Sequence, residues 1–203
     1  MKKIAVLTLC LVGLALADPT SVVAQCSTGT SNQYADAMRM VGEIPGGTKI
    51  HVGQQFSVDC TAAQLQAVTF RLQVDANLTI GTQTCLALGD TVACVLMDLD
   101  HNELARVERT LPFNNGTYDV VFDFSDQTRG LDSGDYIVTW QNVTKSFLFF
   151  GRFGDNHPGF MHVNTNGVWT EEWASDAYFA VTWDENGVPN EQLTWGALKA
   201  DYR

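Results

Sequence analysis

Short segments in which apolar and polar residues alternate make up most of this chain, and they limit the folds it can adopt. The clearest runs from Leu65 to Val74, where every second residue from Val68 onward is apolar. Successive side chains of a strand point to opposite faces, so one face of such a segment packs and the other meets water. The pattern therefore predicts a half-buried β-strand.

The same alternation recurs along the chain, in residues 50–58, 117–124, 136–141, 160–165 and 178–183. Residues 92–99 and 147–150 are apolar on both faces, which is typical of strands covered on both sides. Turn residues such as Asn166-Gly167 separate the segments, and no long helical pattern intervenes. We therefore expect an all-β fold over residues 48–184, an antiparallel β-sandwich of jelly-roll-like form.

The N-terminus has the pattern of an export signal. Lys2 and Lys3 precede an apolar run over residues 4–17, and small residues ending at Ala24 form a cleavage site. A cut after Ala17 is the alternative. The run is shorter than the roughly 20 apolar residues of a membrane span. We expect residues 1–24 to be a signal peptide, the protein to be secreted or at the cell surface, and no transmembrane segment.

Two flanking segments complete the expected organisation. Residues 25–47 form an N-terminal extension with a weak helical pattern over residues 34–40. Residues 185–203 form a C-terminal tail, in which Thr194 is a candidate N-cap for a short helix ending at Tyr202. The last ten residues also resemble a terminal motif of some exported bacterial proteins, which implies an envelope partner. The alternative is a helix that packs Trp195 against the sandwich.

The charge balance excludes some partners. The formal net charge is −11 and no basic cluster offsets it, so the surface repels phosphate groups. We expect no nucleic-acid or anionic-membrane partner. Such acidity suits a solvated extracellular surface or a site for hard cations.

Four cysteines remain after the signal peptide: Cys26, Cys60, Cys85 and Cys94. An even number in an oxidising compartment predicts two disulfides, although three connectivities are open. We expect Cys85 to pair with Cys94 across a short glycine-containing turn, and Cys26 to pair with Cys60. The paired close spacing of a zinc site is missing. Cys26 lies close to the cleavage region, so a lipid anchor is the alternative.

The order of several motifs resembles the β-sandwich modules of exported bacterial surface proteins. The motifs are a "GQ-F" segment at residues 53–56, an "L-V-F" segment at 65–70, a "D-D-N" hairpin at 98–102 and an "L-G-Y" segment at 131–136. The resemblance covers residues 53–183 and implies the fold. It also implies a non-catalytic role in adhesion or glycan binding.

Asp98, Asp100 and Asn102 stand at alternate positions, with Glu103 next, and partly resemble the start of a calcium loop. Calcium takes six to eight oxygen ligands, which alternating acidic and amide residues can supply. Ca²⁺ is therefore the candidate cofactor. The alternative is a metal-free β-hairpin whose tip, at His101-Asn102, reverses the chain.

The candidate ligand-binding residues are two tryptophans with nearby polar residues. Trp169 and Trp173 would stack on sugar rings, and Glu172, Asp155 and Asn156 would bond the hydroxyl groups. The alternative is that these aromatic residues close one end of the core.

Catalytic patterns are weak. Glycoside hydrolysis needs two facing carboxyl groups, but Glu171 and Glu172 are adjacent and would point to opposite faces of a strand. The sequence therefore favours a secreted, non-catalytic carbohydrate-binding module. A structural or adhesive surface protein without a small ligand and a secreted carbohydrate-active hydrolase are the alternatives.

Overall fold

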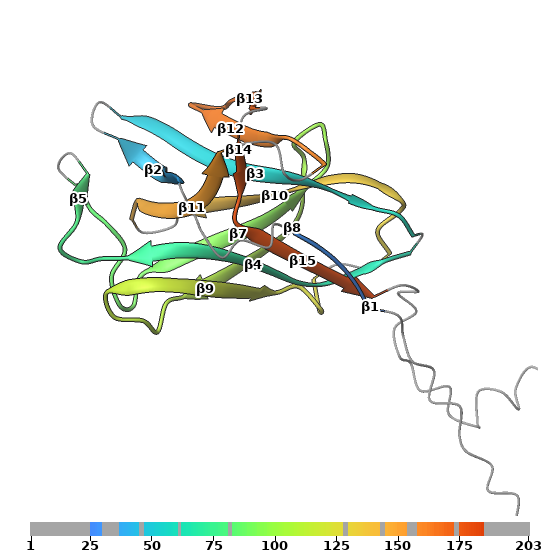
Figure 1. The fold of residues 1–203 in the computed structure, drawn as a ribbon, viewed down its shortest axis with the longest axis horizontal. Coiled ribbons are helices and arrows are strands. Elements are labelled where there is room, and N and C mark those ends of the chain that lie inside the picture. The colour runs from blue at the N-terminus through green and yellow to red at the C-terminus, as the bar shows by residue number, and fades with distance from the viewer. Residues whose placement is uncertain are drawn as a thin grey trace, which may run out of the picture.

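The protein is an antiparallel all-β structure in a computed structural model that describes residues 25–29, 37–44, 47–60, 62–80, 83–127, 130–142, 145–153, 158–172 and 175–184 (Figure 1). The strands are β1 (Gln25–Gly29), β2 (Ala37–Ile44), β3 (Thr48–Val58), β4 (Gln64–Val74), β5 (Thr79–Ile80), β6 (Gln83–Thr84), β7 (Thr91–Met97), β8 (Glu103–Thr110), β9 (Gly116–Asp123), β10 (Gly134–Asn142), β11 (Phe147–Phe153), β12 (Met161–Thr165), β13 (Val168–Glu172), β14 (Ser175–Ala177) and β15 (Phe179–Asp184). The expected all-β, antiparallel architecture is confirmed. Within these residues, no helix has the length and apolar character needed to cross a membrane.

The strands form two sheets that pack as a sandwich. Sheet A contains β1, β4, β9, β11, β14 and β15. Sheet B contains β3, β7, β8, β10, β12 and β13. In Figure 1 the β12–β13 hairpin lies beside β3 at the top of the view, and β4 and β9 lie on the opposite side. The short β5–β6 ladder stands apart from both sheets.

Strand β2 connects the two sheets at a corner. Its first part pairs with β11 and its last part, from Gly42 to Ile44, pairs with β3. Gly42 has a φ of +128°, a backbone conformation that favours glycine. The Ser146 hydroxyl accepts a hydrogen bond from the Glu43 amide at 3.0 Å and donates to the Glu43 carbonyl at 3.1 Å, which holds the corner closed.

The core between the sheets is built from the alternating residues of β4 and their partners. Val68, Phe70, Leu72 and Val74 are all completely buried, as the sequence pattern predicted. The Phe70 ring stacks on Phe122 of β9, with ring centroids 5.0 Å apart. It also meets Trp140 of β10 edge-on at 4.8 Å, so one aromatic cluster joins the two sheets.

Strand β7 is buried on both faces, as its continuous apolar run predicted. Cys94 and Leu96 belong to the main core. Val95 and Met97 point the other way and form a second cluster with Ile137, against which Trp169 packs. Sheet B therefore has an apolar patch on the face opposite the core.

The helix expected over residues 34–40 is wrong in its described part. Residues 37–40 belong to strand β2, because pairing with β11 supplies hydrogen bonds that outweigh a weak helical pattern. Strand β1 pairs with β15, so both described strands of segment 25–47 belong to the sheets. Residues 1–24 and the C-terminal tail with its expected helix lie outside the described residues.

The expected disulfide between Cys85 and Cys94 is also wrong. Cys60, Cys85 and Cys94 are free thiols. Cys94 lies inside β7 and pairs with Trp140 of β10 and Val107 of β8. Cys85 precedes the turn that leads to β7, and its backbone amide donates a hydrogen bond to the Leu78 carbonyl. Strand pairing therefore places the two cysteines in different surroundings, and burial raises the pKa of both thiols. The side chain of Cys26 lies outside the described residues.

Candidate functional site

One row of cross-strand neighbours spans sheet B on the face opposite the core. Residues paired in antiparallel strands point to the same side of a sheet. The row consists of Arg106 in β8, Val95 in β7, Thr139 in β10, Gly53 in β3, His162 in β12 and Glu171 in β13. We call this side, with the residues two positions along each strand such as Gln141 and Trp169, the outer face.

The outer face is strongly curved. Strands β12, β3 and β10 separate β13 from β7, so a flat sheet would hold them about 19 Å apart at 4.8 Å per strand. Trp169 of β13 nevertheless packs against Val95, Met97 and Ile137. A Cβ atom on Gly53 would lie 2.7 Å from Thr139 Cγ2 and 2.8 Å from Ile137 Cγ2. The glycine of the "GQ-F" motif thus allows side chains of β10 to approach the backbone of β3 closely.

Two histidines and a tryptophan meet where the curved sheet closes on itself. His101 lies in the β7–β8 hairpin, and its ring stacks on Trp169 with centroids 4.6 Å apart and an interplanar angle of 10°. His101 Nε2 lies 3.3 Å from His162 Nδ1. His162 Nε2 lies 3.5 Å from Gln55 Oε1. We refer to His101 and His162 as the histidine pair.

The proton positions of the histidine pair follow from its neighbours. The Phe160 amide can only donate, and it lies 3.4 Å from Gln55 Oε1, which identifies that atom as the carbonyl oxygen. His162 Nε2 must therefore carry a hydrogen, and in a neutral ring Nδ1 then accepts from His101 Nε2. Burial lowers the pKa of His162 and His101 lowers it further, against an opposing effect of Glu171. A neutral His162 agrees with this arrangement.

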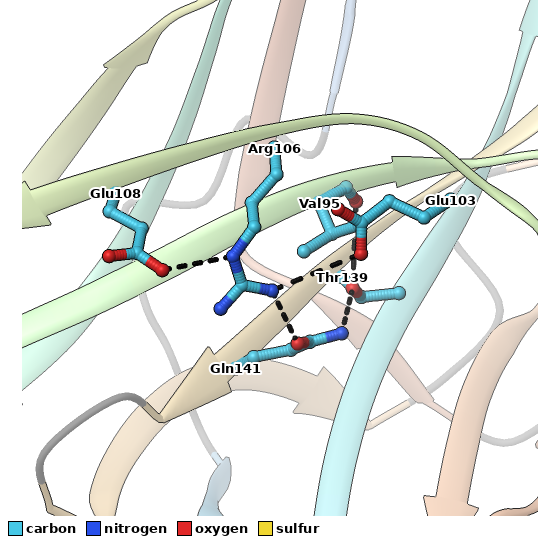
Figure 2. A network of polar contacts seen from close by, with 6 residues as sticks. All are labelled: Val95, Glu103, Arg106, Glu108, Thr139 and Gln141. Atoms are coloured by element: carbon cyan, nitrogen blue, oxygen red, sulfur yellow. Dashed lines mark hydrogen bonds and ion pairs between the residues drawn. The ribbon is translucent and has the colours of Figure 1, made fainter.

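An ordered polar network occupies the β8 and β10 side of the outer face (Figure 2). Arg106 Nε donates to Glu108 Oε1 at 3.0 Å, and Arg106 Nη1 donates to Gln141 Oε1 at 3.0 Å. A carboxylate oxygen of Glu103 lies 4.0 Å from the same Arg106 nitrogen. Gln141 Nε2 donates to the Thr139 hydroxyl at 3.5 Å. The guanidinium and amide planes are therefore held in place before any ligand binds.

His51 lies on the outer face of β3, opposite Asn164 of β12. Burial lowers the pKa of His51, and the positive charges of Lys49 and Arg106 lower it further. The effect of Arg106, which belongs to β8, agrees with the curvature that brings distant strands of sheet B together.

The structure places the predicted ligand-binding residues unevenly. Trp169 is half-buried on the outer face, with one side of its ring against His101. Glu171 shares that face, whereas Glu172 pairs with the core residue Met161 and points to the other side of β13. Trp173, Asp155 and Asn156 lie outside the described residues.

The predicted calcium residues lie in the turn between β7 and β8. The Asp98 carboxylate accepts hydrogen bonds from the Asn102 amide nitrogens, at 2.8 Å from the backbone and 2.9 Å from the side chain. These bonds lower the pKa of Asp98. The β-hairpin between β7 and β8 is confirmed, but the chain reverses at Leu99-Asp100 and not at His101-Asn102, because the His101 and Asp98 amides donate to the carbonyls of Asp98 and Asn102. Across the described ranges, no three His, Cys, Asp or Glu side chains converge on a point that could hold a metal ion.

Sequence reasoning missed most of this face. His101 and His162 are 61 residues apart in the sequence, and Arg106 and Gln141 belong to no motif. The alternation in β8, β10 and β12 indicated which residues share a face of each strand. The register that aligns those strands is not visible in the sequence.

No family model matches the chain, and no curated protein matches it. Among solved structures, the chain is similar to the VP2 subviral particle of infectious bursal disease virus, at 12% identity and a TM-score of 0.26. The match covers 98% of this chain and 52% of the viral chain, so this chain spans about half the length of that protein. A likeness at this level does not identify the function.

Proposed function

We propose that this protein is an exported, non-catalytic, jelly-roll-like module that binds carbohydrate through the outer face of sheet B. The observation that carries the proposal is the preorganised polar network of Arg106 beside Trp169. Val95 pairs with Arg106 and belongs to the cluster with Met97 and Ile137 against which Trp169 packs. Export rests on the signal pattern of residues 1–24.

This combination suits a sugar. A sugar ring presents C–H groups to an aromatic surface and pairs of hydroxyl groups to planar polar side chains. Arg106 and Gln141 are partly exposed and already hydrogen-bonded to each other, so little side-chain entropy is lost when a ligand binds. Glu108 and Glu103 supply further acceptors on the same face.

The placement of the acids favours binding over hydrolysis. Glycosidases use two carboxyl groups about 5–9.5 Å apart on either side of the bond. Glu171 and Glu172 point to opposite faces of β13. Glu103 and Glu108 both lie against Arg106, which orders them as network partners.

One observation favours the second candidate, a structural or adhesive surface module without a small ligand. His101 covers one side of the Trp169 ring, so the tryptophan also acts as an internal contact between two hairpins. On this alternative, the side chains of the outer face would hold the hairpins of the module together and would bind no small ligand. A binding experiment separates the two candidates.

The test is a glycan-array screen of the mature protein in EDTA, followed by calorimetric titration of each hit. We expect saturable binding that Arg106→Ala weakens at least about tenfold, because the charged network is lost. Arg71→Ala is the matched control: Arg71 makes a comparable network with Asp119 and Tyr178, but on sheet A. Unfolding curves of both variants confirm that they fold.

Two results would refute the proposal. One is the absence of binding to any glycan on the array. The other is equal loss of binding in Arg106→Ala and Arg71→Ala, which would place the ligand elsewhere. The first result with a correctly folded protein would favour the structural alternative, whereas the second would show that a glycan binds away from the outer face.

A further inference from the structure

We propose that His101 and His162 form a two-histidine site for a divalent transition-metal ion, with Zn²⁺ as the reference ion. The nitrogens that face each other, His101 Nε2 and His162 Nδ1, are 3.3 Å apart. A tetrahedral ion with metal–nitrogen bonds of about 2.05 Å holds two of its ligand nitrogens roughly 3.3 Å apart. The hydrogen-bonded pair therefore already has the spacing that one shared ion requires.

The second nitrogen of His162 is arranged as in a metal-binding histidine. Such residues usually donate their other N–H to a carbonyl or carboxylate, which fixes the tautomer and the ring orientation. His162 Nε2 lies 3.5 Å from the Gln55 carbonyl oxygen, and the Phe160 amide holds that oxygen at 3.4 Å. This leaves the lone pair of Nδ1 directed at His101. His162 itself is only 2% exposed, so its ring has little freedom to turn away.

The ring of His101 is held by its hairpin and by Trp169. Its backbone has a φ of +64°, unusual for a residue with a side chain, and its amide donates to the Asp98 carbonyl at 3.1 Å. The ring is stacked on Trp169 at 4.6 Å. A strained backbone conformation that the surrounding contacts maintain is common at binding sites.

The surrounding charges favour a cation. Glu171 is paired with His162 across the β12–β13 hairpin, and the chain as a whole is acidic. No third His, Cys, Asp or Glu of the described residues completes a ligand set, so water would fill the remaining positions. Imidazole nitrogens suit zinc, copper and nickel, whereas calcium and magnesium prefer oxygen.

Binding has a defined proton balance. In the metal-free pair, His101 Nε2 donates its hydrogen to His162 Nδ1. The ion needs the lone pairs of both nitrogens, so the His101 hydrogen must move to its Nδ1 atom. No net proton is released from a neutral pair, but a protonated histidine must first lose one. Zinc affinity should therefore fall as the pH is lowered and protons compete with the ion for the imidazole nitrogens.

The experiment uses mature protein freed of metal with EDTA and then dialysed. Isothermal titration with ZnCl₂ should show one saturable site, and zinc at a hundredfold excess over its Kd should raise Tm by about 5–10 °C. MgCl₂ should produce neither effect. His101→Gln and His162→Gln should each weaken zinc binding at least about tenfold. His51→Gln is the matched control, since it removes a histidine of the same face and leaves the pair intact.

Absence of saturable zinc binding would overturn the inference. Binding that survives in both His101→Gln and His162→Gln would also overturn it, because the ion would then be held elsewhere. His101 is partly exposed, so its variant tests the site even if the buried His162 variant fails to fold. The inference does not depend on carbohydrate binding, which is tested in EDTA.

Discussion

The aromatic cluster around Phe70 should contribute a large share of the stability of the sandwich. Phe70 is completely buried and contacts Phe122 in its own sheet and Trp140 in the opposite sheet. Replacing a buried phenylalanine by alanine costs about 3–5 kcal/mol of unfolding free energy. Each favourable ring pair is worth about 0.5–1.5 kcal/mol beyond the buried area. Phe70→Ala should therefore fall in the upper part of the first range, and Phe70→Leu should cost about 1–3 kcal/mol.

Urea and thermal unfolding, followed by tryptophan fluorescence and circular dichroism, measure these losses. At roughly 2–4 °C of Tm for each kcal/mol in a chain of this size, Phe70→Leu should lower Tm by about 2–12 °C. Val121→Ala is the control, because Val121 is next to Phe122 in β9 but 43% exposed. Its free energy of unfolding should change by no more than about 0.5 kcal/mol.

A double-mutant cycle isolates the ring contact itself. Combining Phe70→Leu with Phe122→Leu should give a coupling free energy of about 0.5–1.5 kcal/mol. Coupling near zero would show that the stacked geometry adds nothing to burial. A Phe70→Ala protein as stable as the wild type would refute the view that this cluster joins the two sheets.

Three further predictions concern single groups. Burial lowers the pKa of His162, so the folded protein favours the neutral ring. The stability that this preference contributes is complete above the pKa of about 6.5 in the unfolded chain, and it is lost as the pH falls toward the pKa in the folded protein. Between about pH 7 and 5, the Tm of the wild type should therefore fall more steeply than that of His162→Gln; equal slopes would contradict this. The buried Cys94 thiol should not react with a maleimide reagent until the protein is unfolded, whereas the partly exposed Cys60 can react in the native protein; rapid labelling assigned to Cys94 by peptide mass spectrometry would show that β7 opens. Asn166→Ala should cost about 1–2 kcal/mol in urea unfolding, because Asn166 has a φ of +54° and accepts a bond from the Lys49 amide at 2.8 Å; an unchanged midpoint would argue against strain at this turn.

The strands could be predicted because the pattern of apolar and polar residues that indicates a strand lies within a few consecutive residues. Alternation over residues 65–74 became β4, and the run over residues 92–99 that is apolar on both faces became β7. The hairpin at Asn166-Gly167 was also predicted, since turn residues between alternating segments are a local signal. The β7–β8 hairpin was predicted too, although its turn lies at Leu99-Asp100, two residues before the expected tip. Asn166 and Gly167 both have positive φ, as a two-residue hairpin turn requires.

The failures all concern contacts between distant segments. Cys85 and Cys94 looked ready to pair because they are close in sequence, but pairing with β8 and β10 holds Cys94 in the core. The residues near Met40 looked weakly helical, yet β11 lies beside them and draws them into a strand. Register and sheet order depend on the whole chain, so local patterns do not report them.

The sequence alone determined which residues of each strand share a face, because side-chain direction alternates with every residue of a strand. It therefore specified an antiparallel all-β protein and most of its buried residues. Only the tertiary structure decided which strand faces pack together and which hairpins contact each other. The curvature of sheet B brings Trp169 and His162 of one hairpin against His101 of another, and packs Trp169 against the cluster that contains Val95, the cross-strand partner of Arg106. Curvature of this kind arises from packing across many strands, and no single segment contains it.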